Sequence, residues 1–139
     1  MTLVRPLPSP GIALRIEQLV HLPAVLTQRL GLMPTTSKEA DSSHLRRRNH
    51  YWIHRFRAGS EEAVEADVAM FLASLRPHRE FLVGLRDSGG KTALYLTWSA
   101  GRPRGFEFEF GTIAMMSDLK LDLYLEVFGG SSSDADPEE

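Results

Sequence analysis

The chain has no cysteine among its 139 residues, and it has no apolar run long enough to cross a bilayer. The first absence excludes disulfides and thiol nucleophiles. The second excludes a membrane-spanning helix, which needs about 20 consecutive apolar residues. Residues 1–11 carry one arginine and three prolines without an apolar core, so we expect no signal peptide. These absences favour a cytoplasmic protein that does not enter the membrane.

The net charge of −2 combines two regions of opposite sign. Residues 131–139 carry four acids and no base, and we expect this tail to be disordered because it cannot bury apolar area. Residues 1–130 have the length and composition of a single domain. Within them, His44 to Arg57 holds five arginines and three histidines and no acid, which makes this segment strongly basic.

Alternation of apolar and polar residues is the clearest pattern in the sequence, and it is most regular from Leu119 to Val127. Side chains of a strand point alternately to its two faces, so such segments predict strands with one buried and one wet face. The expected strands are 11–17, 50–57, 92–98, 106–110 and 119–127. The expected helices are 22–31, one capped by Ser60, one starting at Pro77, and 111–117.

Strands with one wet face argue against a parallel sheet covered by helices on both sides. We therefore predict an α+β fold, a two-layer sandwich with a mixed or mainly antiparallel sheet of four to five strands and helices on one face. Trp52 and Leu123 are the side chains most strongly expected in the core. The second face of the sheet should be open to water, a partner or a ligand. It is expected to present Lys120, Tyr95, Glu107, Glu109, Tyr124 and Glu126.

The basic segment follows a long polar connection, Thr35 to Asn49, and loops of this length are often functional. Arginines next to aromatic residues can contact an acidic protein surface, or phosphates and bases. The candidate binding residues are Arg46, Arg47, Arg48, His50, His54, Arg55, Tyr95 and Tyr124.

Catalytic and metal sites have weaker support in the sequence. His50 and His54 would be about 13 Å apart along a strand, too far to share one metal ion. Glu107 and Glu109 have a spacing within the range of an inverting glycosidase pair, but they are better explained as the wet side of a strand. We therefore expect no cofactor, no metal and no catalytic residues, although an enzyme is not excluded.

Three stretches in order, Leu26 to Pro34, Tyr51 to Ile53 and Leu121 to Tyr124, give the chain a resemblance to a known family. The chain resembles the bacterial proteins grouped as domain of unknown function 4279, over about Ile12 to Val127. The resemblance implies no activity and no catalytic residues, because the family has none assigned. Relatives often carry a glycine in the loop before the tryptophan, and Thr35 to Asn49 has none.

The open face, the arginine-rich loop and the lack of a catalytic set favour a non-catalytic protein-interaction module, with an accessory or immunity role as one form of it. The alternative is a small-molecule or single-stranded nucleic-acid binder that uses the basic loop and a groove beside the sheet. A protein partner is favoured over nucleic acid because the body of the domain is nearly neutral. The chain is expected to be a monomer or a homodimer.

Overall fold

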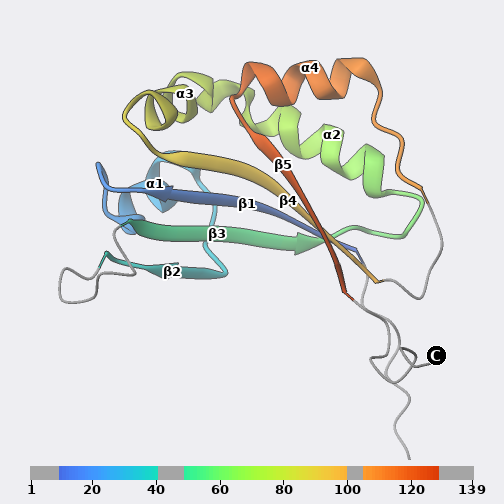
Figure 1. Cartoon of the computed structure of the whole chain (residues 1–139), viewed down its shortest axis with the longest axis horizontal. Coiled ribbons are helices and arrows are strands. Elements are labelled where there is room, and N and C mark those ends of the chain that lie inside the picture. Colours follow the sequence, from blue (N-terminus) through green and yellow to red (C-terminus); the bar gives the residue numbers. More distant parts are fainter. Residues whose placement is uncertain (1–9, 41–48, 100–104, 129–139) are drawn as a thin grey trace, which may run out of the picture.

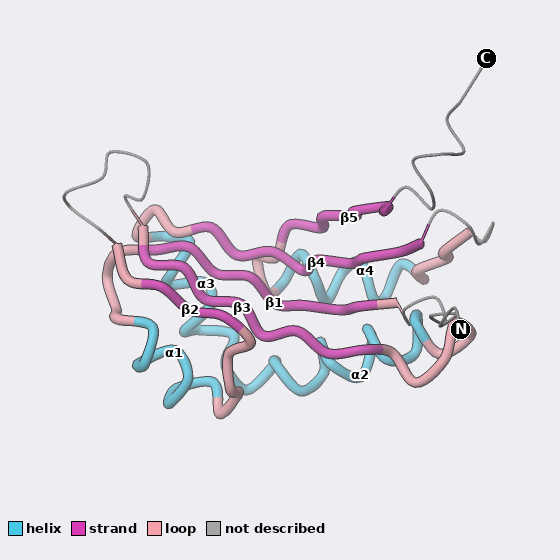
Figure 2. The backbone as a smooth tube through the Cα atoms, turned by 90° about the horizontal axis from the view of Figure 1, so that it is seen from below, coloured by secondary structure: helices cyan, strands magenta, loops and turns pink. Residues whose placement is uncertain are grey.

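The computed structural model describes residues 10–40, 49–99 and 105–128, which form a five-stranded sheet with helices packed on one of its faces (Figures 1 and 2). The strands are β1 (Gly11–Gln18), β2 (Thr36–Lys38), β3 (His50–Arg57), β4 (Lys91–Ser99) and β5 (Asp122–Phe128). The helices are α1 (Pro23–Leu30), α2 (Val64–Leu75), the 3₁₀ turn η1 (Arg76–His78), α3 (Arg79–Asp87) and α4 (Phe110–Asp118).

The strand order is β2-β3-β1-β4-β5, so the first strand of the chain lies in the middle of the sheet. All neighbours are antiparallel except β4 and β5, which run parallel and are connected through α4. A parallel pair needs such a crossover, because a short turn can join only antiparallel strands. The predicted α+β fold with a mixed sheet and helices on one face is confirmed.

The core fills the space between the sheet and the helices. Trp52 is fully buried there, as predicted, and its indole Nε1 donates a hydrogen bond to Thr27 Oγ1 in α1 at 3.1 Å. The alternating pattern of β1 buries Ile12, Leu14 and Ile16 on this side. From the helix layer, the core receives Leu26, Leu30, Val64, Val68, Phe71, Leu72, Leu75, Leu82, Leu85 and Met116.

Helix α1 begins at Pro23 and is capped by Gly31, as the sequence predicts. Pro23 occupies its first turn, where the missing N–H leaves no helical hydrogen bond unmade. Gly31 follows the helix in the left-handed conformation, with φ of 69°, and its N–H donates to Thr27 O at 2.9 Å. The predicted cap at Ser60 is wrong: a turn comes first, and α2 begins at Val64 without a side-chain cap.

The prediction of a strand at 106–110 is also wrong, because the described structure has a loop there that leads into α4. Phe106 and Phe108 pack against the core from a loop, and Phe106 meets the Trp98 ring edge-on with the centroids 4.7 Å apart. Phe110 is the first residue of α4 and is 88 % exposed. Alternating phenylalanines therefore anchor a connection here without pairing to another strand.

The junction between α4 and β5 explains a second difference from the prediction. Lys120 follows the helix with φ of 59°, its N–H donates to Ser117 O at 3.0 Å, and Leu121 N–H donates to Met116 O at 2.9 Å, which together form a Schellman cap. Leu119 and Leu121 are buried, but they lie before the strand. Leu123 lies within β5 and is 50 % exposed, so its predicted place in the core is wrong.

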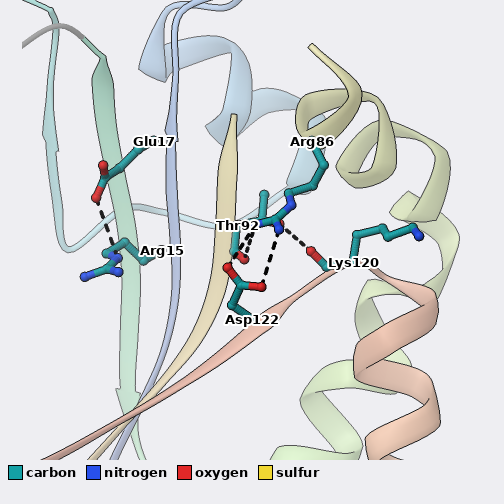
Figure 3. A network of polar contacts seen from close by, with 6 residues as sticks. All are labelled: Arg15, Glu17, Arg86, Thr92, Lys120 and Asp122. Carbon is teal, nitrogen blue, oxygen red and sulfur yellow. Dashed lines mark hydrogen bonds and ion pairs between the residues drawn. The ribbon is translucent and has the colours of Figure 1, made fainter. Parts of the chain in front are cut away.

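A polar network ties this junction to the neighbouring strand (Figure 3). The buried Thr92 hydroxyl donates to Lys120 O at 2.7 Å. Arg86 of α3 donates to both carboxylate oxygens of Asp122, at 3.0 and 3.4 Å, and to Thr92 O at 3.3 Å. These contacts fix the start of β5 beside β4, and with it the side chains that β5 places on the sheet.

Candidate functional site

No described element covers the face of the sheet opposite the helices (Figure 2). We call this surface the open face. The strand register assigns its residues without ambiguity, because partners in adjacent strands point the same way. The open face carries Thr36, Lys38, Tyr51, Ile53, Arg55, Arg57, Gly11, Ala13, Arg15, Glu17, Lys91, Ala93, Tyr95, Thr97, Asp122, Tyr124, Glu126 and Phe128. All three tyrosines of the chain are among them.

Tyr95 is the centre of a cluster on this face, formed with Arg15, Arg55 and Tyr124, which we call the tyrosine–arginine cluster. The Tyr95 and Tyr124 rings stack with centroids 4.6 Å apart and an angle of 15° between their planes. The Arg15 guanidinium carbon lies 5.1 Å from the Tyr95 centroid and 5.4 Å from that of Tyr124. The Arg55 guanidinium carbon lies 5.9 Å from the Tyr95 centroid, so both arginines are within cation–π distance of the Tyr95 ring.

Small side chains on the central strands make this arrangement possible. Ala13 of β1 lies directly between Arg55 and Tyr95, so the long Arg55 side chain can lean across β1 toward the ring. Ala93 of β4 is the partner of Arg15, which leaves room for that arginine beside Tyr95. Both alanines are buried under their larger neighbours. The alternation of small and long residues thus builds the cluster.

The Tyr95 hydroxyl donates a 2.6 Å hydrogen bond to Glu126 Oε1. Tyr95 is 9 % exposed, and its burial, together with the nearby Glu126 carboxylate that accepts its hydrogen bond, raises the pKa of the phenol to about 12. The neutral phenol is therefore favoured in the folded state. Tyr124 and Arg55 are exposed and form the accessible rim of the cluster.

The raised pKa of Tyr95 predicts an alkaline limit to stability. The unfolded phenol ionises near pH 10 and the folded one near 12, so the stability that Tyr95 contributes should be fully present below pH 10 and should be lost between the two values. At about pH 11, absorbance titration should count one phenolate fewer in the folded chain than in the urea-unfolded chain. Glu126→Gln should bring the pKa of Tyr95 down, and Glu17→Gln should not. Equal titration of the folded and unfolded chains would contradict this structure of the cluster.

The sequence matches one family model, Domain of unknown function (DUF4279), over residues 10–127, which is nearly the whole described chain. The chain belongs to this family. No curated protein and no solved structure matches it. Membership in the DUF4279 family confirms the expected resemblance and brings no assigned activity with it.

In this DUF4279 domain, three of the candidate residues meet at one place: Arg55, Tyr95 and Tyr124 all belong to the tyrosine–arginine cluster. Arg15 is a fourth member that was not among the predicted binding residues, although the alternation of β1 already places it on the wet face. Glu126 lies on the open face as expected. Lys120, Glu107 and Glu109 do not belong to it, because Lys120 lies in a turn and the two glutamates lie in a loop.

The remaining candidates lie elsewhere. His54 is on the helix side of β3, where its ring stacks on Phe71 with centroids 6.1 Å apart and its Nδ1 lies 2.7 Å from Met33 O. The His50 Nδ1 accepts a hydrogen bond from Ala40 N at 2.8 Å. Both histidines therefore make contacts within the chain and lie apart from the tyrosine–arginine cluster. The loop arginines Arg46, Arg47 and Arg48 and the expected tail, 131–139, lie outside the described residues.

Within the described ranges of this DUF4279 domain, no group of three or more histidine, aspartate or glutamate side chains could hold a metal ion. None of the described helices is long and apolar enough to span a bilayer. A hollow of about 580 Å³ lies between α1 and β2 on the helix side, away from the cluster. It is lined by Leu22, Pro23, Ala24, Thr27, Met33, Pro34, Ser37, Lys38 and Glu39.

Proposed function

We propose that this DUF4279 chain is a non-catalytic interaction module that binds an acidic segment of a partner protein on its open face. The observation that carries the proposal is the convergence of the Arg15 and Arg55 guanidinium groups over Tyr95. Guanidinium groups bind carboxylates through paired, charge-assisted hydrogen bonds, and two of them beside exposed aromatic surface form a suitable anchor. An accessory or immunity role in a bacterial cytoplasm is one setting for such a module.

The charges of the open face support an acidic partner. The face carries five basic residues against three acidic ones, and each acid already has a partner. Glu126 accepts the Tyr95 hydroxyl, Asp122 binds Arg86, and Glu17 lies 3.8 Å from Arg15. Among the described residues, neither Arg55 nor Arg57 has an acidic partner, so both can receive one from outside.

Single-stranded nucleic acid is the second candidate, and the stacked Tyr95–Tyr124 pair favours it. Exposed aromatic rings on a sheet face can stack on bases, while nearby arginines contact the phosphates. The three acids on the same face would repel phosphates, which makes this candidate weaker than an acidic peptide. Only the nucleic-acid candidate requires bases to stack on the tyrosine rings. Comparing the binding of an acidic peptide with that of single-stranded DNA therefore separates the two candidates.

Binding of a fluorescent oligo-glutamate peptide, measured by polarisation, tests the proposal. The double variant Arg15→Ala/Arg55→Ala should weaken binding at least about tenfold, or about 1.4 kcal/mol, since both anchoring cations are lost. The matched control Arg76→Ala/Arg79→Ala removes two arginines from the helix layer and should leave binding unchanged. Equal losses in the two variants would show that only net charge matters and would contradict the proposed site.

A single-stranded DNA oligonucleotide provides the comparison arm. The acidic-peptide proposal predicts that the DNA binds more weakly than oligo-glutamate and that Tyr124→Ala affects the two probes to a similar, small extent. Tighter binding of the DNA, with a large loss in Tyr124→Ala, would instead support the nucleic-acid candidate. Folding of every variant is checked by circular dichroism.

A further inference from the structure

The two edges of the sheet are built differently. At one edge, β2 has only three residues, all polar and exposed, and it ends in Lys38. Short, charged edge strands of this kind prevent pairing with other chains. At the other edge, β5 has seven residues without proline or glycine, and no described strand pairs with its outer side (Figure 2). Of the two edges in the described sheet, β5 is therefore the longer and the less protected against pairing with another strand.

The side chains of β5 are unusually apolar for an exposed edge. Five of the twelve large hydrophobic residues that are exposed in the described chain lie on this one strand. Leu123, Leu125 and Val127 are each about half exposed on the helix side, because the helices do not extend over this edge. Contiguous exposed apolar surface beside unpaired backbone groups is typical of a surface that another strand covers.

We propose that this surface is covered by a second copy of the chain, with the two β5 strands paired antiparallel about a two-fold axis at Leu125. In this register Leu125 lies opposite Leu125 of the second copy, and Leu123 lies opposite Val127 of the second copy. The apolar residues of the helix side therefore form a continuous stripe across the contact. On the open face, Tyr124 lies opposite Glu126 of the second copy. The contrast with the polar β2 edge favours this closed, symmetric contact over head-to-tail pairing of β5 with β2.

Charge selects this register over the neighbouring ones. Moving the axis to Tyr124 places Asp122 opposite Glu126 of the second copy, twice. Moving it to Glu126 places that carboxylate opposite itself. Like charges directly opposite in an antiparallel pair are destabilising, whereas the Leu125-centred register has no acid opposite an acid. The sequence of β5 is thus complementary to itself at one position.

The dimer would join two five-stranded sheets into one continuous sheet and two open faces into one surface. Each tyrosine–arginine cluster would lie next to the seam, since Tyr124 belongs to both the cluster and β5. The proposal does not depend on what the open face binds, because it rests on the edge strand and its exposed residues.

Sedimentation equilibrium of the full chain tests the dimer by its mass. The wild-type chain should dimerise with a dissociation constant below about 1 mM, so that it is dimeric above this constant and monomeric on sufficient dilution. Leu125→Lys should be a monomer, since it places two cations on the axis, while Ser37→Lys on the β2 edge should remain a dimer. A monomeric wild-type chain, or a dimer that survives Leu125→Lys, would overturn the proposal.

Because the chain has no cysteine, the register can be measured without interference. Leu125→Cys should form an intermolecular disulfide with itself under mild oxidation, since facing residues of an antiparallel pair lie within disulfide range. An equimolar mixture of Tyr124→Cys and Glu126→Cys should cross-link to each other faster than either does alone. Preferred self-linking of Tyr124→Cys would contradict the Leu125-centred register. These cross-links do not depend on the folding of Leu125→Lys.

Discussion

Trp52→Ala should lower the free energy of unfolding by about 3–5 kcal/mol, the largest single effect expected in this domain. The side chain is fully buried in the core between the sheet and the helices, so its truncation leaves a large cavity there. Its loss also removes the 3.1 Å hydrogen bond to Thr27 Oγ1, which then has one partner fewer in a partly buried position. Urea denaturation followed by circular dichroism measures the loss.

Leu123→Ala is the comparison for Trp52→Ala. Leu123 is half exposed at the sheet edge, so its truncation should cost less than about 1 kcal/mol when measured at a concentration where the chain is monomeric. Similar losses for Trp52→Ala and Leu123→Ala would mean that the helix layer covers β5 as well as β3. That result would contradict the arrangement of the helices described above.

Gly90→Ala should destabilise the domain by about 1–3 kcal/mol, because the added methyl group has no room. A Cβ at this position would lie 2.7 Å from Leu85 O, 2.9 Å from Gln18 Cβ and 3.2 Å from Glu17 O. Two of these atoms are backbone oxygens, one in α3 and one in β1, and they can move only if these elements shift relative to the turn. The turn is also held by the 2.8 Å hydrogen bond from Gly90 N to Leu85 O.

Gly84→Ala provides a control for which we expect a change in stability of the opposite sign. Gly84 lies inside α3, and a Cβ there would have nothing within 4 Å. Alanine at an exposed helix position is favoured over glycine by about 0.5–1 kcal/mol, so this variant should be more stable than the wild type. The melting temperatures of the two variants should therefore move in opposite directions. A fall in both, or in neither, would contradict the packing at the α3–β4 turn.

Local patterns predicted which face each strand residue would take, and they did so for β1, β3 and β4. They did not predict what would cover that face. Leu123, Leu125 and Val127 alternate as regularly as Ile12, Leu14 and Ile16, yet the first set is half exposed and the second is buried. The difference comes from strand order, since β1 lies in the middle of the sheet and β5 at its edge. Strand order depends on pairing between distant segments.

The same limit applies to the candidate site. Tyr95, Tyr124 and Arg55 could be assigned to the wet face from their own strands, but their meeting depends on β1 lying between β3 and β4. Arg15 becomes part of the cluster only through that pairing. The short strand β2 has no periodicity of its own and exists through its bonds to β3. Conversely, alternation at 106–110 predicted a strand that has no partner in the described sheet.

The central claim is that the open face, and not the helix layer, binds the partner. Nuclear magnetic resonance titration of the labelled chain with oligo-glutamate tests it residue by residue. We predict that amide and side-chain shifts concentrate on Arg15, Arg55, Tyr95 and Tyr124, while α2 and α3 remain unchanged. Shifts confined to the helices, or no shifts at concentrations where the peptide is bound, would contradict the claim.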